Sequence, residues 1–184
     1  CYKRDKIRAY WRPIHLVSNQ AKDILLSPAI VPSNPPLRMV GALYEIIHRW
    51  TRPNKRPEFN IHNVQSNHTK YKVVEKTVLE KSFCRLKVFE KVGCKIEQPT
   101  VLVVAPLSGH YATLLKDTIQ TLLQDHTVYV TDWISAYNVP LDEGSFDLDT
   151  YVDYLEDFYA LLGAGIHVLA VCQPCVPVLM AAAL

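Results

Sequence analysis

The stretch I-H-V-L-A-V-C-Q-P-C-V-P-V-L, residues 166–179, decides the fold of this chain. Its first six residues are almost entirely apolar, which is typical of a strand buried on both faces of a sheet. An apolar, helix-like run over residues 176–184 follows at once. Cys172 therefore lies where a strand turns directly into a helix. This arrangement predicts a nucleophile elbow, a tight turn that lifts one side chain above the sheet.

An elbow of this kind favours a reactive thiolate at Cys172, because the N-terminus of the following helix attracts negative charge. The backbone N–H of Gln173 is then a donor for an oxyanion, and the loop around Leu107 and Ser108 is expected to supply a second donor. The common G-x-S-x-G pattern is replaced by A-V-C-Q-P over residues 170–174. Its proline suits the first turn of a helix.

Two further apolar runs predict buried strands, T-V-L-V-V-A at 100–105 and T-V-Y-V-T-D-W at 127–133. Apolar residues recur at helical spacing over 111–123 and 148–162, between these strands. Alternation of strand and helix predicts an α/β fold with a mostly parallel sheet and flanking helices.

The ends of the second helix carry recognisable signals, with Asp147 as the expected N-cap and Gly163 as the C-terminal stop. Ahead of the parallel strands, residues 71–79 and 83–92 alternate with period two. This pattern predicts an N-terminal antiparallel hairpin.

The chain is expected to divide into an extension, residues 1–69, and an α/β domain, residues 70–184. The extension contains two amphipathic stretches, 14–26 and 37–50, joined by the proline-rich connector 27–36. Residues 51–69 are polar and are expected to form a loop.

Composition excludes several classes of function. Hydrophobic residues make up 49% and charged residues 21% of the chain, and the net charge of +2 is too small to indicate nucleic acid as a partner. No apolar run is long enough to span a membrane, and no signal peptide is expected. The five cysteines then indicate a reducing compartment. Cys84 and Cys94 are expected to be structural, and we expect no metal and no cofactor.

Four segments resemble the intracellular poly(3-hydroxybutyrate) depolymerases. They are E-K-T-V-L-E-K-S-F-C-R-L (75–86), V-L-V-V-A-P-L-S-G-H-Y-A-T-L-L-K-D-T (101–118), V-Y-V-T-D-W (128–133) and V-C-Q-P-C-V-P-V-L (171–179). The A-P-L-S-G-H and V-C-Q-P-x-V-P-V-L blocks are the distinctive ones. Position 175 departs from the family pattern, because it is Cys where Thr is expected.

The resemblance implies an α/β-hydrolase fold and hydrolysis of a storage polyester on granules in the bacterial cytoplasm. It also implies a Cys-Asp-His triad, with Cys172 as the nucleophile. The Asp and His of such a triad lie on later strands. We therefore expect the chain to be the N-terminal portion of a longer enzyme and to be inactive alone.

Other residues near the strand ends are weaker candidates. His110, Asp132 and Trp133 fall on the same side as Cys172 and are candidates for lining the site. Two alternative functions remain open from the sequence. The C-Q-P-C motif at Cys172 and Cys175 suits thiol–disulfide exchange, and a non-catalytic piece that binds granules is the other.

Overall fold

The computed structural model describes residues 14, 16–21, 23–25, 35–51, 57–107, 111–136 and 138–184. The chain divides into two compact units, Cys1–Lys55 and Arg56–Leu184. This division differs from the boundary expected after residue 69, because the second unit also contains the segment 56–69.

The described part of the first unit is helical. Helix α2 spans Pro35–Thr51, and proline is well tolerated at the first position of a helix. The described residues between 14 and 25 are helical too, so the described parts of both amphipathic stretches form helix as predicted. Residues 27–34 of the expected connector lie outside the described residues, and residues 35 and 36 belong to α2. No helix in the described ranges is both long and apolar enough to cross a membrane.

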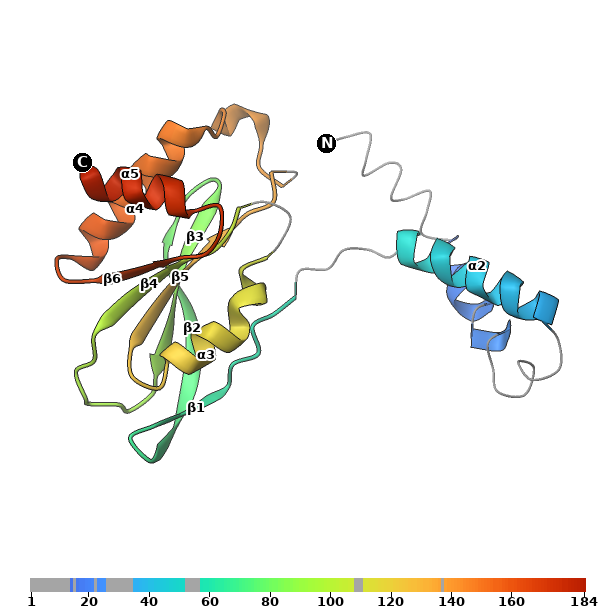
Figure 1. The fold of residues 1–184 in the computed structure, drawn as a ribbon, viewed down its shortest axis with the longest axis horizontal. Helices are drawn as coiled ribbons and strands as arrows, with labels where there is room; N and C mark the ends of the chain where they lie inside the picture. The colour runs from blue at the N-terminus through green and yellow to red at the C-terminus, as the bar shows by residue number, and fades with distance from the viewer. Residues whose placement is uncertain are drawn as a thin grey trace. The chain divides into compact units, whose positions relative to one another are not determined.

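The second unit is built on a six-stranded sheet with the strand order β1-β2-β3-β5-β4-β6 (Figure 1). The strands are β1 (Asn63–Ser66), β2 (Thr69–Glu80), β3 (Cys84–Lys91), β4 (Thr100–Val104), β5 (Thr127–Trp133) and β6 (His167–Ala170). The pairings β1–β2, β2–β3 and β3–β5 are antiparallel. The two parallel pairings among the described strands both involve β4, with β5 on one side and β6 on the other.

The sheet is therefore mixed, and the prediction of a mostly parallel sheet is wrong. The predicted hairpin does form, as β2 and β3. It then joins the sheet through antiparallel pairing of β3 with β5, which extends the same sheet by three strands. The alternating pattern of the hairpin is a local signal, whereas the choice of β5 as partner is a long-range contact that no local pattern encodes.

Strand β1 is a second difference, because the sequence predicts loop over residues 51–69. Val64 and Ser66 of β1 are buried, and the Ser66 hydroxyl donates to the Gln124 carbonyl at 2.5 Å. Asn67 and His68 have φ of 46° and 62°, the left-handed pair that a two-residue hairpin turn needs. A four-residue polar strand is too short for its alternation to stand out.

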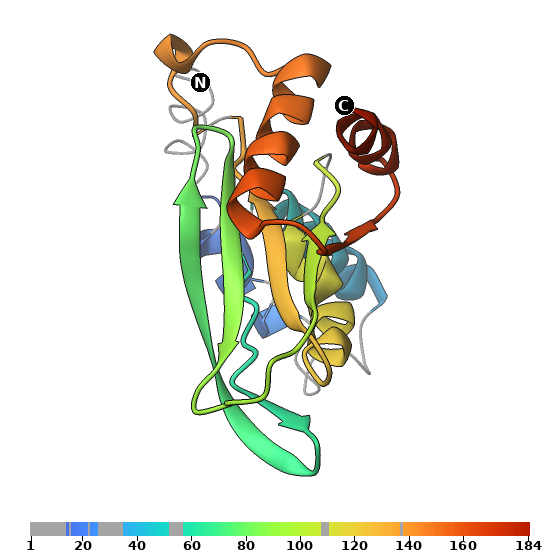
Figure 2. The same cartoon turned by 90° about the vertical axis from the view of Figure 1, so that its left-hand side faces the viewer.

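Helices cover both faces of the sheet. The short turn η1 (Ala112–Leu115) leads into α3 (Lys116–Leu122), and the turn η2 (Leu141–Glu143) precedes α4 (Leu148–Leu162). Helix α5 (Cys175–Ala183) follows β6. Figures 1 and 2 show α3 on one face of the sheet and α4 and α5 on the other. The predicted flanking helices are thus confirmed.

The predicted ends of α4 are also confirmed. The Asp147 carboxylate accepts from the Thr150 backbone N–H at 2.9 Å and from the Thr150 hydroxyl at 2.7 Å. Both hydrogen bonds lower the pKa of Asp147 from its usual value, and the bond from the Thr150 backbone N–H has the larger effect. Gly163 ends the helix with a φ of 80°, a conformation that glycine adopts without strain.

Aromatic side chains fill the core on each face of the sheet. Under α4, the Trp133 ring lies 4.6 Å from the Tyr151 ring and 5.6 Å from the Phe146 ring, centroid to centroid. On the opposite face, the rings of Phe59 and Phe89 meet edge to face at 5.1 Å. Phe158 of α4 is fully buried.

Strand β6 departs from the expectation that it is buried on both faces. It is the last strand of the sheet, and His167, Val168 and Leu169 are exposed. Because β6 pairs only with β4 among the described strands, its other edge meets no described strand.

Replacing Phe158 with alanine is expected to lower the free energy of unfolding by about 3–5 kcal/mol, since the core cannot refill the space of a buried ring. Urea denaturation followed by circular dichroism measures this change. Leu161→Ala is the matched control, because Leu161 lies on the same helix but is 52% exposed. Equal losses in the two variants would contradict this assignment of the core.

Candidate active site

Cys172 lies in the connection between the end of β6 and the start of α5, and its side chain is exposed. Its φ is 68°, in the left-handed region. For a residue with a side chain this region costs roughly 1–2 kcal/mol. A strained backbone of this kind, at a sharp strand-to-helix turn, is the geometry in which hydrolases present a nucleophile.

Backbone hydrogen bonds hold the turn on both sides of Cys172. Before it, the Val171 N–H donates to the Val104 carbonyl at 3.3 Å and so continues the pairing of β6 with β4. After it, the Cys175 N–H donates to the Cys172 carbonyl at 3.3 Å. Pro174 directly precedes α5 with a φ of −60°, the value that its ring imposes. These contacts join β6 to α5 through a turn in which Cys172 has a strained backbone conformation.

Two of the three expected oxyanion donor residues, Gln173 and Leu107, are brought together. The Gln173 side-chain carbonyl accepts from the Leu107 backbone N–H at 3.2 Å. This hydrogen bond links the loop after β4 to the turn after β6. It also occupies the Leu107 N–H, so an oxyanion at this donor would have to displace the Gln173 amide. Ser108, the third expected donor, lies outside the described residues.

The end of β4 is fixed by side chains of β5 that the sequence analysis did not single out for this purpose. The Ala105 N–H donates to the Thr131 hydroxyl at 2.9 Å, and the Trp133 indole N–H donates to the Ala105 carbonyl at 2.8 Å. Both backbone groups of Ala105 are therefore satisfied inside the fold. Thr131 and Trp133 hold the chain at the point where the loop toward Leu107 begins.

Trp133 was a candidate for lining the site, and the structure places it in the core. It is 5% exposed, and its ring contacts are those with Tyr151 and Phe146 described above. A buried indole usually needs a hydrogen-bond acceptor, and the Ala105 carbonyl is that acceptor.

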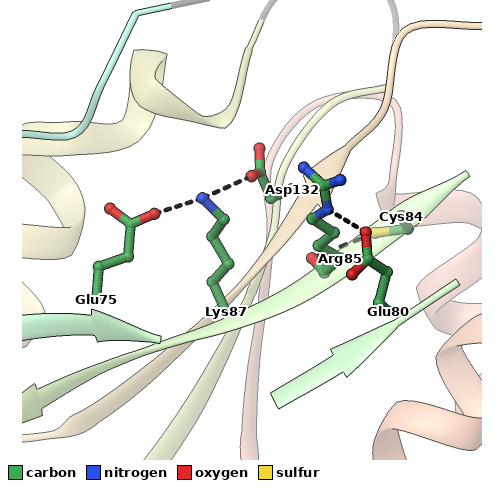
Figure 3. Close-up of polar contacts among 6 residues, drawn as sticks. All are labelled: Glu75, Glu80, Cys84, Arg85, Lys87 and Asp132. Carbon is green, nitrogen blue, oxygen red and sulfur yellow. Dashed lines mark hydrogen bonds and ion pairs between the residues drawn. The ribbon is translucent and has the colours of Figure 1, made fainter. Parts of the chain in front are cut away.

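Asp132, a second candidate for lining the site, is 1% exposed and forms an ion pair with Lys87 at 3.0 Å (Figure 3). Lys87 also pairs with Glu75, so its ammonium group lies between two carboxylates on β2 and β5. Buried charges persist in proteins when they are paired. These contacts tie neighbouring strands together, at a position where solvent scarcely reaches Asp132.

Two described histidines, His126 and His167, lie at the amino ends of β5 and β6 and not beside Cys172. The rings of His126 and His167 meet edge to face at 6.3 Å. His167 is the first residue of β6, whereas Cys172 follows its end, so the strand separates the two by roughly 15 Å. His110 lies outside the described residues. Within the described ranges, no group of His, Cys, Asp or Glu side chains is arranged to hold a metal ion.

Cys175 is exposed and unoxidised, like Cys172. It is the first residue of α5, and its thiol lies 3.7 Å from the Ala170 carbonyl. The motif therefore places one thiol on the strained turn and the other on the helix.

No protein-family model matches this chain, and no curated protein or solved structure is significantly similar to it. The resemblance to depolymerases consequently rests on the sequence segments alone.

Comparing two variants tests the strain at position 172. Cys172→Gly is expected to be about 1 kcal/mol more stable than Cys172→Ala, since both lack the thiol but only glycine adopts a positive φ without cost. Thermal or urea unfolding measures the difference. Ala160, exposed in the last turn of α4, is the control position: there glycine should be less stable than alanine, by up to about 1 kcal/mol. The same sign at both positions would contradict the strained turn.

Proposed function

We propose that this chain carries the nucleophile of an α/β-hydrolase that cleaves ester bonds in poly(3-hydroxybutyrate) or a closely related storage polyester. The observation that carries the proposal is the positive φ of Cys172, 68°, between a parallel strand and a helix. An unfavourable conformation at a residue with a nucleophilic side chain is typical of functional sites.

The order of the strands supports the hydrolase part of the proposal. The series β2-β3-β5-β4-β6, with β4 parallel to β5 and β6, resembles the first five strands of an α/β-hydrolase sheet. In such a sheet the nucleophile follows the fifth strand, as Cys172 does here. The second oxyanion donor comes from the loop after the strand that is third of those in chain order, here β4, where Leu107 lies.

In the proposed reaction the Cys172 thiolate attacks the ester carbonyl carbon. A carbon–sulfur bond forms, the bond to the chain oxygen breaks, and that oxygen leaves as an alcohol after taking a proton. Water then attacks the thioester carbon, releases the acid and returns the sulfur to its starting state. The backbone N–H groups of Gln173 and Leu107 would stabilise the oxyanion, the latter after release from the Gln173 side chain.

A thiol alone does not complete this cycle. A histidine must accept the thiol proton and activate water, and a carboxylate must orient that histidine. The family resemblance implies a His and an Asp for these two roles, on strands later than β6. It also implies that the enzyme acts on polymer granules in the bacterial cytoplasm. We include this location and the two triad partners in the proposal.

In the full-length protein, Cys172→Ala is expected to lower hydrolysis of 3-hydroxybutyrate oligomers by about 10⁴-fold or more, since the nucleophile is lost. Release of acid measured by titration at constant pH follows the reaction. Cys175→Ser is the matched control and should keep activity within about twofold, because that thiol lies on the helix.

Thiol–disulfide exchange is the second candidate, favoured by the two exposed thiols of the C-Q-P-C motif. Its test is reduction of a protein disulfide, which Cys175→Ser would abolish. Full ester hydrolysis without Cys172 would reject the hydrolase proposal. Loss of disulfide reduction in the Cys175→Ser variant, without any ester hydrolysis by the parent protein, would favour the second candidate.

A further inference from the structure

A second feature of the carboxyl edge of the sheet is a hollow between the start of β3 and the end of β5. We call it the β3–β5 hollow. Its volume is about 380 Å³, within the range of sites for small organic molecules. Arg85 and Ser82 line it from the β3 side, and Ile134, Ser135, Asn138 and Val139 line it from the segment after β5. Cys172 is not among the lining residues.

Arg85 supplies a cationic group in this hollow. Its Nε donates to the Glu80 carboxylate at 2.7 Å, and its two terminal nitrogens point away from Glu80 (Figure 3). These nitrogens make no hydrogen bond to any residue in the described part of the chain. A guanidinium presents its terminal donors in a fork that matches a carboxylate.

The remaining lining suits a short aliphatic acid. Glu143 is the one acidic residue on the wall, and it already accepts a hydrogen bond from the Ser82 hydroxyl. Ser135 and Asn138 offer further donors, while Ile134 and Val139 form an apolar wall. A ligand with one carboxylate and a small apolar body matches both halves of the hollow.

Resting on the proposed function, we propose that the β3–β5 hollow binds the free carboxylate end of a hydroxyalkanoate chain, with Arg85 as the specificity-determining residue. Strands in a sheet lie about 4.8 Å apart. Three such steps separate β3 from β6, so Arg85 lies roughly 14 Å from the end of the strand that leads to Cys172.

A 3-hydroxybutyrate repeat has four backbone bonds where a peptide residue has three, and extends roughly 4.7 Å on that scale. About three repeats therefore span the distance from Arg85 to Cys172. With the carboxylate held at Arg85, attack by Cys172 releases the acid-bearing end as the leaving alcohol. The inferred enzyme thus recognises acid-ended chains and removes short oligomers from that end.

Binding of the 3-hydroxybutyrate trimer, compared with that of its methyl ester, tests this inference. Isothermal titration calorimetry is done on the full-length protein with Cys172→Ala, which prevents turnover. The acid is expected to bind at least about tenfold more tightly than the methyl ester, because hydrogen bonds to charged groups are the strong ones. Arg85→Gln should remove this preference and leave binding of the ester unchanged.

Two matched controls separate the hollow from general charge effects. Lys76→Gln removes the same charge from the same hairpin, where Lys76 pairs with Glu90, and should leave acid binding within about twofold. Glu80→Gln removes the partner of Arg85 but keeps its guanidinium, and should retain the preference for acid. Asn138→Asp, at an exposed position, places a negative charge in the hollow and should weaken acid binding even if Arg85→Gln does not fold.

Equal affinity for acid and ester, or equal acid binding by Arg85→Gln and Lys76→Gln, would overturn the inference. Cys172-dependent hydrolysis of the acid tetramer with a KM that is unchanged by Arg85→Gln would likewise overturn it, while the proposed function would stand. If the acid binds through Arg85 but the parent protein cleaves no ester, the carboxylate site holds and the proposed function fails.

Discussion

The parallel pairing of β4 with β5 on one side and β6 on the other is the constraint on which the rest of the second unit depends. Residues 102–104 of β4 are fully buried, so the strand must satisfy its backbone groups through these two neighbours. Parallel pairing directs the ends of all three strands to one edge. Leu107, the residues after Trp133, and Cys172 therefore lie along the same edge although they are far apart in sequence.

The strained turn at Cys172 is stable because it is held from both sides. Val171 continues the pairing with β4, and the Cys175 N–H bonds back to the Cys172 carbonyl. The Gln173 side chain adds a third tie, to the loop after β4. Each hydrogen bond contributes about 1 kcal/mol net, which together is enough to offset one residue in the left-handed region. A helix of apolar residues, α5, then packs beside α4 and anchors the turn.

The charged residues Asp132, Lys87 and Arg85 lie on neighbouring strands and have different roles, which follow from their burial. Asp132 is buried, and its pairing with Lys87 connects β5 to β3, where removing Lys87 would leave the buried carboxylate uncompensated. Arg85 lies nearer the carboxyl edge than Lys87, is partly exposed, and uses only its Nε in an ion pair. Strand β3 thus supplies two cations. Lys87 stabilises the sheet, whereas the terminal donors of Arg85 remain available at the β3–β5 hollow.

Local signals in the sequence were sufficient for the hairpin, the Asp147 cap, the Gly163 stop and the position of Cys172 at a strand-to-helix turn. Each depends on neighbours within a few residues, through periodicity, capping or turn chemistry. The partner of β3 and the bonds of Ala105 to Thr131 and Trp133 depended on tertiary structure. These contacts join segments that lie tens of residues apart. Burial of the whole sheet decides which segments pair, and no local sequence pattern measures that burial.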